Sequence, residues 1–181
     1  MAAEHRRRRK THLDQHVKDV SGDYHYIGDW YAPAGGSKTL QPFLILTFLL
    51  IAAVIGSGCV NTPGLRDTWY VILPFLLEAA LLFFLVWRAI KLLTRDARLK
   101  AYDYERVVPG LPQLLSAQCA AALLAGLCAG VEIALHGMNG QTAENVLYLL
   151  LKAAAAALAL LSRRSIQSVT WVRESATGPA T

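Results

Sequence analysis

Four long apolar runs dominate the pattern of hydrophobic and polar positions along the chain. They cover residues 43–60, 68–87, 112–135 and 143–161. A helix of about 20 apolar residues crosses a hydrocarbon core about 30 Å thick. Backbone polar groups in lipid must be bonded within their own segment, so apolar runs of this length are expected to be helices. The pattern therefore predicts an all-α fold, a bundle of four transmembrane helices arranged as two hairpins.

Polar stretches around these runs define the predicted domain organisation. A basic and aromatic N-terminal segment covers residues 1–42, and a polar tail covers residues 163–181. Between them, a membrane domain spans residues 43–162 and contains a polar loop at 88–111. The stretch WRAIKLLTRDARLK (Trp87–Lys100) starts at the last residue of the second run and extends into this loop. This stretch predicts that the second helix continues beyond the bilayer as a basic amphipathic helix.

Lysine and arginine are distributed unevenly over these polar stretches. Sixteen of the eighteen basic residues lie in the N-terminal segment, the loop 88–111 and the tail, whereas the two short connections contain only Arg66. Cytoplasmic segments of membrane proteins carry the positive excess. Both termini and the loop are therefore expected to be cytoplasmic, in a plasma or inner membrane. The same distribution accounts for the net charge of +5 without a nucleic-acid partner.

The N-terminal segment contains candidate lipid-binding residues. Its basic run is Arg6, Arg7, Arg8 and Arg9. A basic side chain near an anionic membrane surface contributes about 1 kcal/mol of binding. Trp30 lies in an aromatic cluster that suits the headgroup region. The sequence thus predicts contact with anionic lipid headgroups, although the arginines also serve simply to set the orientation of the first helix.

Two charged residues interrupt the apolar runs near their centres. Glu78 lies ten residues after Thr68, and Lys152 lies ten residues after Thr142. With a rise of 1.5 Å per residue, each charge is about 15 Å from the same side of the membrane. A charge at this depth costs about 2.5–3.5 kcal/mol on insertion scales, so pairing is favourable. We predict a contact between Glu78 and Lys152, with two interpretations: an ion pair that holds two helices together, or a proton or cation site.

Other polar residues share helix faces with these charges. Asn145 and Tyr148 lie on the same helical stripe as Lys152. On the third run, Glu132 and His136 are four residues apart near the outer end. They are expected to form either an external mouth or an interfacial hydrogen-bonded pair.

The third run also contains a G-x-x-x-G pattern at Gly126 and Gly130. Small residues at this spacing let two helix backbones approach closely in a membrane. The pattern predicts helix packing at both glycines, within the bundle or between protomers. A homo-oligomer or a larger membrane complex is the expected assembly.

The sequence offers little that indicates enzyme chemistry. The three cysteines all lie in apolar runs, and the chain has neither a metal-binding triad nor a nucleophile motif. We therefore expect no metal, no cofactor and no catalytic residues. Two functions are consistent with the pattern. One is an accessory or scaffolding membrane protein that acts through helix packing and a basic cytoplasmic face. The other is a small oligomeric transporter or channel that uses Glu78 and Lys152.

Overall fold

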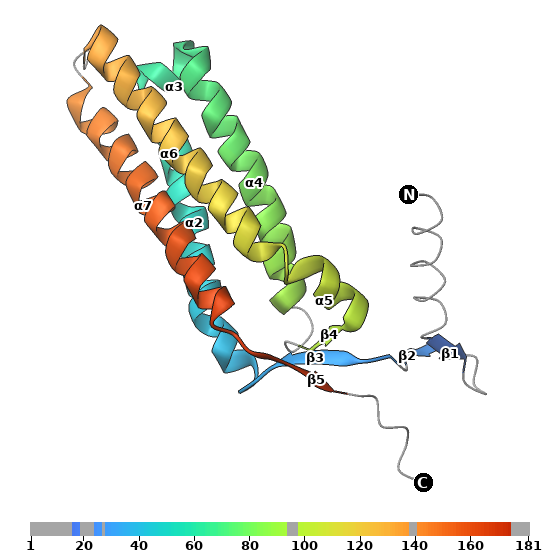
Figure 1. Ribbon diagram of the computed structural model, residues 1–181. Coiled ribbons are helices and arrows are strands. Elements are labelled where there is room, and N and C mark those ends of the chain that lie inside the picture. Colours follow the sequence, from blue (N-terminus) through green and yellow to red (C-terminus); the bar gives the residue numbers. More distant parts are fainter. Residues whose placement is uncertain (1–15, 19–23, 27, 94–97, 138–140, 175–181) are drawn as a thin grey trace.

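The computed structural model describes residues 16–18, 24–26, 28–93, 98–137 and 141–174, and its centre is a bundle of helices (Figure 1). Four of these helices are long and apolar enough to cross a membrane. They are α2 (Gln41–Cys59), α4 (Trp69–Leu93), α6 (Leu111–His136) and α7 (Thr142–Gln167). The predicted all-α bundle of four transmembrane helices is confirmed.

Short elements connect the long helices. They are η1 (Ser37–Leu40) before α2, α3 (Pro63–Asp67) between α2 and α4, and α5 (Ala101–Val107) before α6. Proline lies in the first turn of both α2 and α6, where its missing N–H leaves no helix bond unmade. Gly137 ends α6 with φ 75°, a left-handed conformation that glycine adopts without steric cost.

The first and last transmembrane helices pack against each other. α7 packs mainly on α2 and α6, and α4 packs mainly on α6, whereas α2 and α4 touch each other little. The outer faces of the helices are apolar: Phe48 on α2 is 69% exposed and Leu127 on α6 is 68% exposed. Large apolar side chains turned outward all around a bundle indicate contact with lipid. The chain is therefore a small polytopic integral membrane protein.

A small antiparallel sheet lies at one end of the bundle and was not predicted from the sequence. Its three strands are ordered β4 (Leu99–Lys100), β3 (Trp30–Pro33) and β5 (Trp171–Glu174), with β3 in the centre. Tyr31 of β3 stacks on Tyr104 of α5 with ring centroids 4.1 Å apart. The sheet thus joins the segment before α2, the loop after α4 and the segment after α7.

The expectation that the second helix continues beyond the run 68–87 is correct only in part, because the helix extends to Leu93 and not to Lys100. α4 ends at Leu93, residues 94–97 lie outside the described part, and Leu99 and Lys100 form β4 rather than a continued helix. The reason is that Leu99 and Lys100 lie opposite Tyr31 and Trp30 in the sheet and pair with β3. A further two-stranded hairpin, β1 (His16–Lys18) with β2 (Tyr24–Tyr26), precedes β3.

The two ends of the bundle carry different elements. The sheet end carries β3, β4 and β5, and the α3 end carries the α2–α4 and α6–α7 connections (Figure 1). α4 and α7 both run from the α3 end to the sheet end. The segments leading into α2 and out of α7 therefore lie at the same end of the molecule.

Candidate functional site

The centre of the bundle contains the contact that was predicted between the two buried charges. The Lys152 ammonium of α7 donates a hydrogen bond to Oε2 of Glu78 on α4. Their side chains are only 2% and 0% exposed. α4 and α7 run in the same direction, so residues equally far from their starts lie at equal depth. The ion pair links α4 to α7, two helices that otherwise pack mainly on α6 or α2 rather than on each other.

Two aromatic rings complete the surroundings of the Lys152 ammonium. Its Nζ lies 4.7 Å from the ring centroid of Phe75 and 5.1 Å from that of Tyr148. A cation held against aromatic faces is attracted by their negative quadrupole. Oε1 of Glu78, by contrast, has no hydrogen-bond partner within the described part of the chain. The pair therefore neutralises both charges but leaves one carboxylate oxygen unsatisfied.

Gly126 lets α6 approach this pair closely. A methyl group at Gly126 would lie 3.4 Å from Cβ of Lys152, so a longer side chain would push the two helices apart. At Gly130, an added methyl group meets no atom within 4 Å. Gly126 thus lies at a close contact between α6 and α7, and the predicted contact at Gly130 stays a prediction.

A second polar cluster lies at the α3 end. The Tyr70 hydroxyl of α4 donates to Oε2 of Glu132 on α6, and Nδ1 of His136 lies 3.2 Å from Oε1 of the same carboxylate. The His136 side chain is 59% exposed, whereas that of Glu132 is 14% exposed. Glu132 therefore connects an exposed histidine to the interior of the bundle.

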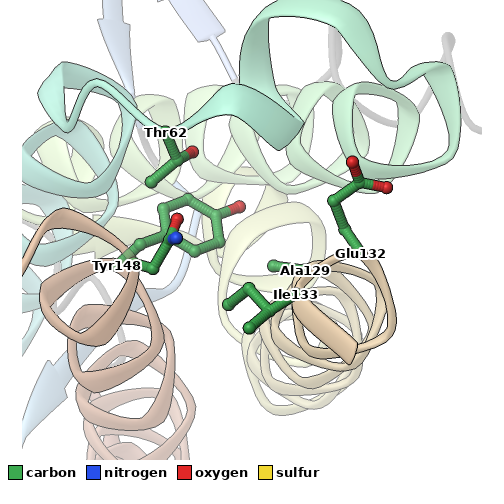
Figure 2. Close-up of a pocket in the computed structure, with 6 residues that line it drawn as sticks. Thr62, Ala129, Glu132, Ile133 and Tyr148 are labelled. Atoms are coloured by element: carbon green, nitrogen blue, oxygen red, sulfur yellow. The ribbon is translucent and has the colours of Figure 1, made fainter. Parts of the chain in front are cut away.

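A small cavity lies between this cluster and the ion pair. Its volume is about 10 Å³. A cavity of about 10–15 Å³ has room for one water molecule. The lining residues are Thr62, Ala129, Glu132, Ile133, Asn145 and Tyr148. Figure 2 shows the Tyr148 ring of α7 facing α6 across this space, with its hydroxyl turned into it.

Tyr148 separates the cavity from the ion pair. Its hydroxyl is buried and has no hydrogen-bond partner within the described part of the chain. Its ring contacts the Lys152 ammonium. The structure thus brings together four of the residues singled out in the sequence: Glu132 and Tyr148 at the cavity, and Lys152 and Glu78 below it. Asn145, buried on the same face of α7, also lines the cavity.

Several site residues were not identified from the sequence. Tyr70 belongs to the polar cluster at the α3 end and Thr62 lines the cavity. The pattern of one helix does not reveal which residue of another segment lies opposite. A different group of buried polar side chains occurs nearer the sheet end: Thr47, Gln118 and Ser162, whose side-chain polar atoms have no hydrogen-bond partner within the described residues. In the sequence, these three residues could be recognised only as polar residues in or next to the apolar runs.

The predicted lipid-binding residues have different outcomes. Arg6, Arg7, Arg8 and Arg9 lie outside the described residues. Trp30 belongs to β3 and is half-buried, with its ring 5.3 Å from that of Tyr26 in an edge-to-face arrangement. Its contact with lipid headgroups stays a prediction.

Comparisons with known proteins found no relative of this chain. No protein-family model, curated protein or solved structure matches this chain. Within the described ranges, no group of three or more histidine, cysteine or acidic side chains is placed to hold a metal ion.

Proposed function

We propose that this small polytopic membrane protein is an accessory or scaffolding subunit that holds a folded cytoplasmic surface against the membrane. The observation that supports this function best is the sheet of β3, β4 and β5, which collects three separate segments of the chain at one end of the bundle. The basic residues concentrate in these same segments, so we assign the sheet end to the cytoplasm.

The interior polar contacts support a structural role for the bundle. The Lys152–Glu78 pair joins α7 to α4, and the Tyr70–Glu132 hydrogen bond joins α4 to α6. Apolar side chains contact lipid as favourably as they contact another helix, so the hydrophobic effect does not drive transmembrane helices together. Hydrogen bonds and ion pairs between helices therefore contribute to holding the bundle together. The bundle thereby gives the sheet a fixed position relative to the membrane.

The surface of the sheet offers charges of both signs to a partner. Arg173 of β5 donates to Asp29 at 2.5 Å, and Arg98 lies 3.8 Å from Glu174. The two arginines are largely exposed, and Glu174 and Asp29 are 45% and 30% exposed, so these ion pairs stabilise the fold only weakly and can exchange with groups on another protein. A surface of mixed charge suits a protein partner in a larger membrane complex.

The test is to purify the protein from its native membrane in a mild detergent and to measure the mass and composition of what is purified. We expect a complex heavier than one chain. Tyr31→Ser removes the ring that stacks on Tyr104 and should release the partner while the helical signal in circular dichroism is retained. The control is Tyr102→Ser, which removes an exposed tyrosine from neighbouring α5. A wild-type protein that always purifies as a single chain would contradict the proposal.

A second candidate, a small transporter or channel, is favoured by one specific observation. The cavity at Tyr148 lies between the Glu132–His136 pair, in which only the histidine is exposed, and the buried Lys152–Glu78 pair. Such an arrangement suits coupling of a substrate to proton binding. Proton release on addition of a substrate to the purified protein would support transport, and a Glu78→Gln variant that releases the same number of protons would contradict it.

A further inference from the structure

A groove lies on the outer surface of α7, in the part of the helix that leads towards β5 at the sheet end (Figure 1). Its volume is about 420 Å³. We infer that this groove binds an anionic phospholipid, with the lipid phosphate at Arg163 and Arg164 and an acyl chain along the apolar part of the groove. The inference is independent of the accessory role and of which side of the membrane the sheet end faces. The lining residues are Ala157, Leu160, Leu161, Arg163, Arg164 and Gln167.

The first argument is the order of apolar and basic residues along the groove. Its three apolar lining residues lie within the apolar run 143–161, and Arg163 follows one residue after the end of that run. Residues three and four apart lie on one side of a helix, so Leu160 adjoins both Arg163 and Arg164. The end of an apolar run marks the edge of the hydrocarbon core, beyond which the polar headgroups lie. The groove is thus apolar where lipid chains lie and basic where lipid phosphates lie.

The second argument is that the two arginines of the groove have no partner in the protein. Within the described residues, neither Arg163 nor Arg164 forms an ion pair or a side-chain hydrogen bond, and Nε of Arg163 has no acceptor. None of the described lining residues is acidic. The groove therefore carries two positive charges that this part of the chain does not neutralise.

The other described arginines of the sheet end differ from these two. Each of them has an oxygen atom of another residue as its partner. They are Arg88 with the Val107 carbonyl, Arg98 with Glu174, Arg106 with the Tyr102 hydroxyl and Arg173 with Asp29. Unpaired guanidinium groups are thus a feature of the groove and not of this end of the molecule in general.

The third argument is the chemistry of the groups. A guanidinium binds a phosphate through two parallel N–H···O hydrogen bonds, and the side-chain amide of Gln167 supplies further donors on the same side of the helix. Basic pockets at the edge of transmembrane helices bind anionic headgroups. In a zwitterionic lipid, the amine of the headgroup offsets the phosphate charge, so two arginines favour a lipid with a net negative charge. The apolar half of the groove lies within the spanning run, which fits a lipid better than an acidic water-soluble protein.

Arg164 also has a purely structural explanation, because it lies in the last turn of α7. A positive charge there complements the partial negative charge of the helix end, and it helps to set the orientation of the helix in the membrane. Neither effect needs a groove or distinguishes one lipid from another. Selectivity between lipids at this position is therefore the measurement that separates the two explanations.

The experiment places the full chain in phosphatidylcholine nanodiscs that contain a trace of a photoreactive lipid. The probe is phosphatidylglycerol or, in parallel, phosphatidylcholine, and both carry the same photoreactive acyl chain. After illumination, mass spectrometry of peptides gives the ratio of phosphatidylglycerol to phosphatidylcholine labelling over residues 157–161. We expect a ratio of roughly ten, from two basic side chains near one phosphate. Phe84, exposed on α4, is the internal reference and should give a ratio near one.

Two double variants with the same loss of charge test the site. Arg163→Gln/Arg164→Gln should lower the ratio over residues 157–161 to that of the reference. Arg98→Gln/Arg173→Gln removes two arginines that already have carboxylate partners and should leave the ratio unchanged. A wild-type ratio near one would overturn the lipid site and leave an acidic protein as the partner that these charges fit. An equal loss in both double variants would overturn it too, since it would show attraction by surface charge in general.

Two further measurements complete the test. Excess inorganic phosphate, added at constant ionic strength, should leave the ratio unchanged; a ratio that falls to one would identify a site for free phosphate and overturn the lipid assignment. If the Arg163→Gln/Arg164→Gln variant does not fold, Arg164→Gln alone changes only an exposed side chain. This variant should lower the ratio severalfold, and an unchanged ratio would overturn the inference.

Discussion

The Glu78–Lys152 contact leads to a prediction about the stability of the bundle. Each single replacement by an apolar residue of similar size, Glu78→Leu or Lys152→Met, leaves the other charge buried without its partner. Both side chains are at most 2% exposed, so water cannot substitute for the missing partner. Breaking a buried pair in this way costs about 3–5 kcal/mol, whereas replacing both members by apolar groups is often neutral or stabilising by about 1–4 kcal/mol.

The double variant Glu78→Leu/Lys152→Met should therefore be much more stable than the sum of the two single changes indicates. From the costs of breaking such pairs, we expect a coupling of at least about 3 kcal/mol. The assay is reversible unfolding of the four proteins in mixed micelles, with the free energy of unfolding obtained for each. A matched cycle, Leu77→Ala with Leu150→Ala, probes exposed positions on the same two helices and should be additive.

Additive effects within about 0.5 kcal/mol for the charged pair would refute the reasoning. Glu78 and Lys152 would then not depend on each other for neutralisation. The same result would also remove the interaction that links α4 to α7 in our description of the bundle.

Three further predictions concern other parts of the molecule. Gly126→Leu should lower the unfolding temperature far more than Gly130→Leu, since only Gly126 faces a close helix contact; equal losses in the single-chain protein would contradict this. A cysteine at Ser168 should react with an impermeant thiol reagent only from the cytoplasmic side and one at Glu144 only from the other side, and the reverse pattern would invert the topology. Tyr70→Phe should lower the unfolding temperature by breaking a hydrogen bond to a carboxylate, and an unchanged unfolding temperature would contradict that bond.

The helices and the ion pair were the predictable parts of this structure. Apolar runs of spanning length leave the backbone no alternative to a helix in lipid, so four helices follow from the pattern alone. The contact between Glu78 and Lys152 follows from equal depth and from the cost of an isolated charge. The inward face of α7 was also predictable, because Asn145, Tyr148 and Lys152 recur at helical spacing.

The sheet and the cavity were not predictable in the same way. β4 has two residues and β3 and β5 have four each, too short for an alternating pattern to stand out. Their pairing joins residues as far apart as Trp30 and Glu174. The cavity depends on how α7 is rotated relative to α6, because this rotation places Tyr148 against Ala129. The pattern of polar and apolar residues in each helix does not give that relative rotation. Local patterns predicted single elements, whereas contacts between distant segments needed the structure.

The central strand of the sheet has a consequence for the order of events during synthesis. β3 is made before α2, α4, α6 and α7, but one of its two partners, β5, is made only after α7. The first membrane helix, α2, likewise finds its main packing partner in the last, α7. Neither the three-stranded sheet nor the contact between α2 and α7 can form until β5 has left the ribosome and α7 has been inserted. A chain that stops before β5 leaves that edge of β3 unpaired, and an unpaired strand edge can pair with another chain.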